Sequence, residues 1–412
     1  MIDKIKTYKS SNQNKMSMLI LALLPILAWY KIPFPVGLGY ALVMIVSIYY
    51  IVRSSFNINV LPNMFWAVFA YVCFMWMYNH HFSFWSLFPP GGWVFFIFVL
   101  ALIWGVMSFD LGLLKKYMHW IVIISGVLFW IQLACVVAMG SPKFCFVPNL
   151  TGAFTYEDFS YADIVNKHIN GGMPCSIFLE KSYLAYYFLS YLSLIWFETN
   201  EKRKMFTKEI IFVIATLIAS RSGTALVGFS VLFAVKVFSV FWTASIGRRV
   251  LLFLLLIPMI VGCIYLYADT EMGQQMLNRT EELSSEGTSG YARVVNGYMM
   301  FDQLTPEQKV FGISDARERF GYEKKSGAFV FYVNGVQSIL LNMGYIGILL
   351  YFLFYANVFH KVGLTSRMCV VVLLVMSLLE ANYLNSYMML LTIIPCAEAY
   401  LKRNVLITKY YN

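Results

Sequence analysis

Residues 208–242, KEIIFVIATLIASRSGTALVGFSVLFAVKVFSVFW, decide the fold of this chain. A single helix over this stretch would extend for roughly 50 Å, well beyond the roughly 30 Å hydrocarbon layer of a bilayer. The small polar residues SRSG at 220–223 are typical of a turn between two helices. We therefore predict two membrane helices, at 208–220 and 223–242, joined at this turn.

Arg221 lies at the predicted turn and is the first candidate for a functional residue. An arginine at the centre of a membrane helix costs roughly 2.5 to 3.5 kcal/mol, so it must meet water, protein or an anionic ligand. At the end of a hairpin the cost is smaller, because the long side chain reaches the interface. Ser220 and Ser222 flank Arg221 and favour a polar pocket, although serines also ease helix turns.

The composition places the chain among membrane proteins. Of its 412 residues, 60% are hydrophobic and 13% are charged, and the 35 Phe, 28 Tyr and 10 Trp are too many for an ordinary soluble domain. The formal net charge is +10, but the basic residues cluster between apolar runs. The sequence therefore predicts an all-α integral membrane protein, and membrane topology rather than nucleic acid explains the positive charge.

The apolar runs predict about twelve transmembrane helices in a single polytopic membrane domain, residues 1–412. They lie near residues 16–34, 36–52, 64–78, 93–109, 117–139, 183–197, 208–220, 223–242, 250–267, 336–359, 368–380 and 385–401. Several runs are shorter than the roughly 20 residues that cross a bilayer, so their ends must use interfacial Tyr, Trp and Lys. We interpret the first run as a retained span, because no small-residue cleavage pattern follows it.

The short basic connections indicate the orientation. With two helices in 208–242 they all fall on one side, which also holds the basic N-terminus: Arg53, Lys115, Lys116, Lys202, Arg203, Lys204, Arg248, Arg249, Lys361, Arg367, Lys402 and Arg403. Basic loops prefer the cytoplasm, so both termini are predicted to be cytoplasmic.

Two long segments, 140–182 and 268–335, then face outward and carry most of the acidic residues. The second contains YARVVNGYMMFDQL, which suits an amphipathic helix at the interface, followed by TPEQ, which begins another helical turn. Cys145 and Cys175 share the first segment. They could form a disulfide in an oxidising compartment, but the sequence leaves their separation open.

Several classes of chemistry lack support in the sequence. There is no HExxH motif, Walker loop or DxD motif, and the histidines are adjacent or scattered rather than helically spaced. We therefore expect no metal and no cofactor, and ATP-driven transport is unsupported.

Glu180, Arg221 and Arg293 form the candidate catalytic set, because each lies at a predicted outward membrane edge. The planar forks of two guanidinium groups suit a diphosphate, and a carboxylate can serve as a general base. Structural roles remain open for all three: Arg221 could cap the hairpin, Glu180 could pair with a neighbouring cation, and Arg293 could face solvent.

Three stretches around these residues resemble the Wzy-type O-antigen and capsule repeat-unit polymerases of the O-antigen polymerase and ligase superfamily. They are PCSIFLEKSYLAYYFLSYL (174–192), LIASRSGTALVGF (217–229) and YVNGVQSILLNMGYIGILLYF (332–352). Lys181 replaces the proline usual in the family. Val333 and Asn334 stand where many relatives, especially ligases, have His-Asn, which favours a polymerase over a ligase.

The resemblance implies a GT-C-like glycosyltransferase of the bacterial inner membrane, acting at the periplasmic face without a metal. It would transfer the growing chain from undecaprenyl diphosphate to the non-reducing end of a new lipid-linked oligosaccharide unit. Arg221 and Arg293 would neutralise the departing diphosphate, and Glu180 would be the base. The residues predicted to bind substrate are Ser220, Ser222, Asn296, Tyr298 and Asn334.

The resemblance also implies the partners: the lipid-linked oligosaccharide, membrane lipid, a chain-length regulator and a flippase, with no nucleic acid. Two alternatives stay open. One is an O-antigen ligase, which differs only in its acceptor, the lipid A core. The other is a flippase or transporter of lipid-linked oligosaccharide, although such proteins commonly show internal repeats and we detect none here.

Overall fold

The computed structural model describes residues 12–30, 37–53, 58–79, 92–140, 174–198, 206–243, 291–323, 329–331, 333–381 and 383–411. Almost all of these residues are helical. The elements are α1 (Asn12–Leu27), α2 (Leu38–Arg53), η2 (Ile58–Val60), α3 (Asn63–Asn79), α4 (Gly92–Met107), α5 (Leu111–Met139), α7 (Lys181–Trp196), α8 (Lys208–Ala219), α9 (Gly223–Thr243), η5 (Ala292–Asn296), α13 (Gly297–Asp302), α14 (Pro306–Phe311), α15 (Ala316–Phe320), β1 (Tyr322–Glu323), β2 (Phe329–Val330), α16 (Gly335–Lys361), α17 (Leu364–Leu379) and α18 (Ser386–Tyr411).

The predicted apolar runs coincide with helices, except for 250–267, which lies outside the described residues together with Cys145 and most of segment 140–182. By length and composition, Leu111–Met139, Gly223–Phe241 and Gly335–Lys361 can cross a membrane. Four shorter apolar helices accompany them: Asn14–Leu27, Leu38–Arg53, Gly92–Met107 and Leu364–Leu379. The described residues are therefore consistent with the predicted α-helical membrane protein.

The predicted break in 208–242 is confirmed. Helix α8 begins at an N-cap, Thr207, whose hydroxyl accepts the backbone N–H of Ile210 at 3.3 Å, and it ends at Ala219. Helix α9 begins at Gly223. Between them Arg221 has a φ of 47°, a left-handed conformation that turns the chain.

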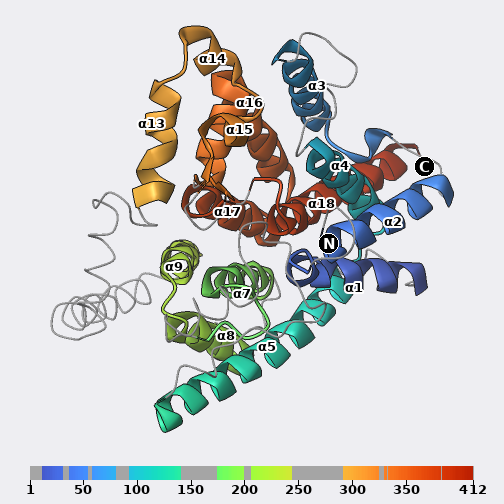
Figure 1. The fold of residues 1–412 in the computed structure, drawn as a ribbon. Coiled ribbons are helices and arrows are strands. Elements are labelled where there is room, and N and C mark those ends of the chain that lie inside the picture. Colours follow the sequence, from blue (N-terminus) through green and yellow to red (C-terminus); the bar gives the residue numbers. More distant parts are fainter. Residues whose placement is uncertain are drawn as a thin grey trace.

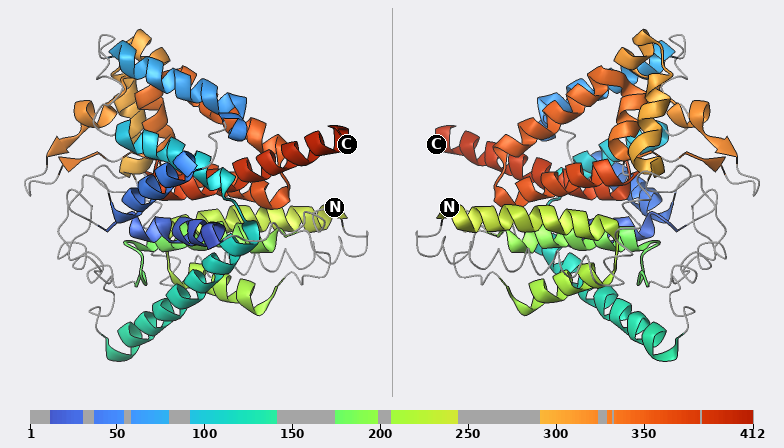
Figure 2. Two further views of the ribbon diagram at one scale, coloured as in Figure 1. Left: turned by 90° about the vertical axis from the view of Figure 1, so that its right-hand side faces the viewer. Right: turned by 90° about the vertical axis from the view of Figure 1, so that its left-hand side faces the viewer.

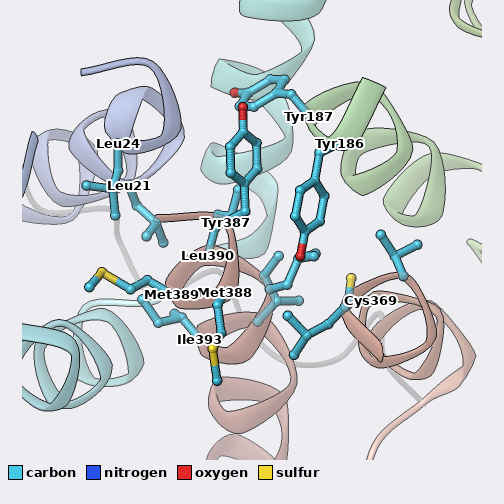
Figure 3. Packing of buried hydrophobic residues seen from close by; sticks show 14 of the residues in the cluster. Leu21, Leu24, Tyr186, Tyr187, Cys369, Tyr387, Met388, Met389, Leu390 and Ile393 are labelled. Atoms are coloured by element: carbon cyan, nitrogen blue, oxygen red, sulfur yellow. The ribbon is translucent and has the colours of Figure 1, made fainter. Parts of the chain in front are cut away.

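Helix α7 is the central helix of the described structure, because its residues from Ser182 to Trp196 are all buried. It packs against α17 and α18, and Figure 3 shows Tyr186 of α7 beside Tyr387 of α18, with ring centroids 4.5 Å apart. The Tyr387 hydroxyl donates to the backbone oxygen of Tyr183 at 2.9 Å, as a buried hydroxyl requires. Glu180 thus lies at the end of the most enclosed helix.

Helices α13, α14 and α15 gather around α16 on one side of the molecule. Figure 1 shows α13, α14 and α15 around α16, while α9, α7 and α17 lie beside one another. In Figure 2 the hairpin of β1 and β2 lies at the opposite end of the molecule from the C-terminal end of α18. The hairpin end is the one predicted to face outward.

Helix α16 is broken at Gly344, where φ is 63° and ψ is −166°. The break exposes two backbone carbonyls: Leu341 O accepts the N–H of Ile313, and Asn342 O accepts the N–H of Ser314, both at 3.0 Å. The Tyr71 hydroxyl of α3 donates to Met343 O at 2.8 Å. These hydrogen bonds satisfy the backbone carbonyls that the break leaves without a partner inside the helix. They also fix the segment that joins α14 and α15 on the first half of α16.

Gly344→Ala is expected to destabilise the protein by about 1 to 3 kcal/mol from backbone strain alone. A Cβ atom would add a steric overlap, because it would lie 2.3 Å from Val310 O. The midpoint of thermal unfolding in detergent measures the effect. Gly112→Ala is the matched control, since its new Cβ would meet only Asp110 Oδ1 at 3.4 Å. Equal midpoints for the two variants would contradict this account of the kink.

Candidate functional site

A buried carboxylate, Glu380, is the centre of the candidate site. Its side chain is 6% exposed, and its Oε1 atom lies 2.9 Å from Arg293 Nη1. The same oxygen accepts the Thr224 hydroxyl at 2.6 Å. Arg293 comes from η5, Thr224 from the first turn of α9, and Glu380 from the residue after α17. We call these three residues the ionic cluster; it joins segments that are far apart in the sequence.

The start of α16 holds the backbone around the ionic cluster. Asn334 and Gln337 form a capping box, and both also bind η5: Asn334 Nδ2 donates to Arg293 O and Gln337 Nε2 donates to Val294 O, each at 2.8 Å. The N–H of Gly335 donates to Glu380 O, also at 2.8 Å. Arg293 and Glu380 are therefore fixed by their main chains as well as by their ion pair, which preorganises the site.

Glu180 lies close to the ionic cluster. It is the half-buried N-cap residue of α7, and Ser182 Oγ donates to its Oε2 atom at 3.4 Å. It is also within electrostatic range of Glu380. Glu380 is almost fully buried and is paired with Arg293 and Thr224, whereas Glu180 is half-buried. The site thus holds two neighbouring carboxylates in different surroundings.

Arg221 lies on the same α8–α9 hairpin, three positions before Thr224, and its side chain is exposed. Across the part of the chain that the structure describes, its side chain makes no hydrogen bond or ion pair. Arg293, by contrast, is bound to Glu380 and is 34% exposed. The structure therefore places Arg293 on an element that contacts Glu380 and Arg221 at the start of the hairpin helix that carries Thr224, with Arg293 anchored and Arg221 exposed.

The residues predicted to bind substrate divide into two groups. Ser220 and Ser222 are buried in the turn, where Ser220 Oγ donates to Leu217 O at 2.7 Å and accepts the N–H of Ser222 at 3.4 Å. Asn334 is buried too, and both polar atoms of its amide are bound within the chain. These three residues hold the site together, while Asn296 is half-buried and Tyr298 is exposed on η5 and α13. Their predicted contacts with substrate stay predictions.

Sequence reasoning missed Glu380 and Thr224. A usable signal existed for Glu380, because it is the single acidic residue between Val362 and Ala397, at the junction of two apolar runs. A lone carboxylate there points to a partner inside the protein. Thr224 had no comparable signal, since small hydroxyl residues are common in membrane helices.

Thr224→Val is expected to lower the stability of the protein by about 1.5 to 3 kcal/mol. The change keeps the shape of the side chain but removes a buried hydrogen bond to a charged acceptor. Thermal unfolding in detergent is the measurement, and Ser230→Ala, an exposed hydroxyl on the same helix, is the control. An unchanged midpoint for Thr224→Val would show that Glu380 does not depend on this hydroxyl.

The apolar helices and the buried ionic cluster together indicate a helical membrane protein with an ionic site at one end. Comparison of the chain with protein-family models, with curated proteins and with solved structures finds no match in any of the three.

Proposed function

We propose that this chain is a polymerase of undecaprenyl-diphosphate-linked oligosaccharide repeat units, with about twelve spans in a GT-C-like arrangement and its site at the periplasmic face of the inner membrane. The observation that carries the proposal is the pair formed by Arg293 and Glu380. A buried carboxylate holds a partly exposed guanidinium beside a hairpin that carries a second exposed arginine, Arg221, and the sequence predicts that both arginines lie at the outer edge of the membrane. Such an arrangement suits binding of a lipid diphosphate.

The reaction replaces one carbon–oxygen bond at the anomeric carbon by another and transfers one proton. A hydroxyl oxygen of the new lipid-linked unit attacks the anomeric carbon of the growing chain, and the bond from that carbon to the diphosphate breaks. The electron pair leaves with undecaprenyl diphosphate, where the charges of Arg221 and Arg293 stabilise it. The proton of the attacking hydroxyl goes to a carboxylate.

Glu180 suits the role of base better than Glu380 does. The Oε1 atom of Glu380 already binds Arg293 and Thr224, and its side chain is almost fully buried. Glu180 is half-buried, so a substrate hydroxyl can reach its carboxylate more easily than it can reach that of Glu380. Glu380 is better suited to orienting Arg293, which makes it a positioning residue in this proposal.

Purified protein in lipid nanodiscs, supplied with lipid-linked repeat units extracted from the cell that makes it, tests the proposal. Elongation without another enzyme is the expected result. A transporter would leave the units unchanged, and a ligase would need the lipid A core before it transferred anything. Absence of elongation by well-folded protein would overturn the proposal.

Arg221→Ala is expected to reduce the elongation rate at least 100-fold, because a donor to the developing charge of the leaving group is lost. Stability should change little, since the side chain is exposed and makes no bond in the described part of the chain. The rate of formation of longer chains, resolved by gel electrophoresis, is the measurement. Arg317→Ala, another exposed arginine, is the control. Full-length chains made at the normal rate by Arg221→Ala would remove Arg221 from the mechanism.

A further inference from the structure

A polar hollow lies apart from the ionic cluster, between the outward-predicted end of α3 and the α14–α15 segment. It has a volume of about 360 Å³ and is lined by Asn79, Gln308, Ile313, Asp315, Glu318 and Arg319. This volume falls in the range of roughly 300 to 1,000 Å³ that small-molecule sites occupy. Figure 1 shows α14 and α15 beside α16, and Asn79 Nδ2 joins α3 to this segment through Ser314 Oγ at 2.6 Å.

The walls of the hollow are fixed by hydrogen bonds to other parts of the fold. Ala316 N donates to Asn342 Oδ1 at 2.9 Å, beside the bonds that tie Ile313 and Ser314 to the broken helix α16. A capping box between Thr305 and Gln308 closes the start of α14. The hollow is therefore shaped before any ligand binds, which lowers the entropic cost of binding.

The lining side chains use only part of their hydrogen-bonding capacity on the walls. Gln308 Oε1 accepts hydrogen bonds from Thr305 N and from Arg319 Nη1, so the amide nitrogen of Gln308 remains available to donate to a ligand. Asp315 accepts the N–H of Glu318 with Oδ1, which leaves its second oxygen. Within the described ranges the carboxylate of Glu318 has no hydrogen-bond or ion-pair partner. The lining thus offers donors and acceptors side by side, as the hydroxyl groups of a sugar require.

The charges of the lining favour a different ligand in this hollow from the one proposed at Arg221 and Arg293. Two carboxylates and one guanidinium give it a net negative charge, which disfavours a diphosphate. A metal ion is also disfavoured, because no group of three His, Cys, Asp or Glu residues gathers among the residues that the structure describes. A hydroxyl-rich, uncharged ligand fits the remaining chemistry best.

The hollow and the ionic cluster share one support, the first half of α16. Asn334 and Gln337 bind η5, and Asn342, five residues after Gln337 and thus about 7.5 Å further along the helix axis, binds α15. We infer that the hollow is a carbohydrate subsite, which binds a sugar of the oligosaccharide away from the bond that reacts. This inference rests on the proposed function for the identity of the ligand, but sugar binding itself needs no polymerisation.

The test measures binding of lipid-free oligosaccharide repeat units, released from the polysaccharide of the cell that makes this chain, to the purified full-length protein by isothermal titration calorimetry. The variant Glu318→Ala/Arg319→Ala removes two exposed lining side chains and is expected to weaken binding at least tenfold. Gln303→Ala is the matched control, because Gln303 is exposed in the same region but does not line the hollow.

Arg221→Ala distinguishes this inference from the proposed function. It should keep the oligosaccharide affinity within about twofold while the elongation rate falls at least 100-fold, because Arg221 is exposed and does not line the hollow. Normal affinity in the Glu318→Ala/Arg319→Ala variant, or no binding by the unmodified protein, would overturn the subsite. If the lipid-free oligosaccharide binds as expected but the unmodified protein does not elongate lipid-linked repeat units, the subsite stands and the proposed polymerase falls.

Discussion

Arg293→Ala is expected to reduce the elongation rate by a factor of about 100 to 1,000, the loss that follows removal of one donor to a developing negative charge. Its guanidinium is anchored to Glu380 at 2.9 Å on one side and remains 34% exposed on another. The anchored geometry means that little reorganisation is needed when the diphosphate departs. The measurement is the initial rate of chain elongation in nanodiscs, normalised to the folded fraction.

Arg293→Lys separates charge from geometry in this experiment. The ammonium keeps a positive charge beside Glu380 but lacks the planar fork that binds two phosphate oxygens at once. We expect it to fold normally and to recover only part of the rate. Full activity in Arg293→Lys would show that a point charge suffices, and full activity in Arg293→Ala would exclude Arg293 from the reaction.

Removing either partner of the ion pair is expected to lower the stability of the protein, and the loss should be larger for Arg293→Ala than for Glu380→Ala. Arg293→Ala leaves Glu380 as an unpaired carboxylate with 6% exposure, at an expected cost of about 3 to 5 kcal/mol. Glu380→Ala leaves a guanidinium that is one-third exposed and can be hydrated, at an expected cost of about 1 to 3 kcal/mol. Denaturation by SDS in mixed micelles measures both.

The double variant Arg293→Ala/Glu380→Ala completes the cycle. Arg293→Ala leaves the charge of Glu380 unpaired, and Glu380→Ala removes that charge. The two losses of stability should therefore not add, and the double variant should be more stable than Arg293→Ala alone. Strict additivity would contradict a direct interaction. A larger loss for Glu380→Ala than for Arg293→Ala would contradict the unequal burial of the two groups.

Much of the helical framework follows from the sequence because it depends on local patterns. Apolar runs lower their free energy in lipid only as helices that satisfy their own backbone, so their positions could be predicted. The break at SRSG followed from the length of the apolar stretch and from the small polar residues at its centre. The start of α14 followed from TPEQ, where Thr305 and Gln308 form the capping box that such a motif favours.

The candidate site was only partly predictable. Arg293 and Glu180 stood out as charges beside apolar runs, but the partner of Arg293 is 87 positions away in the sequence. The spacing of apolar residues indicates which face of a helix is buried, but it does not indicate which other helix packs against that face. The kink at Gly344 was equally invisible, because a glycine in an apolar helix is common and the close approach of Val310 and Gly312 to this glycine is a tertiary contact.

The sequence by itself determined that this chain builds apolar helices, where most of them begin and end, and that Arg221 lies at a turn rather than inside a span. These outcomes depend on hydrophobic transfer and backbone hydrogen bonding, which act over a few residues. Only the tertiary structure decided that Arg293 and Thr224 share the carboxylate of Glu380, and that Asn79 meets the α14–α15 segment. Such pairings depend on how helices pack against one another, and no local pattern of residues encodes that choice.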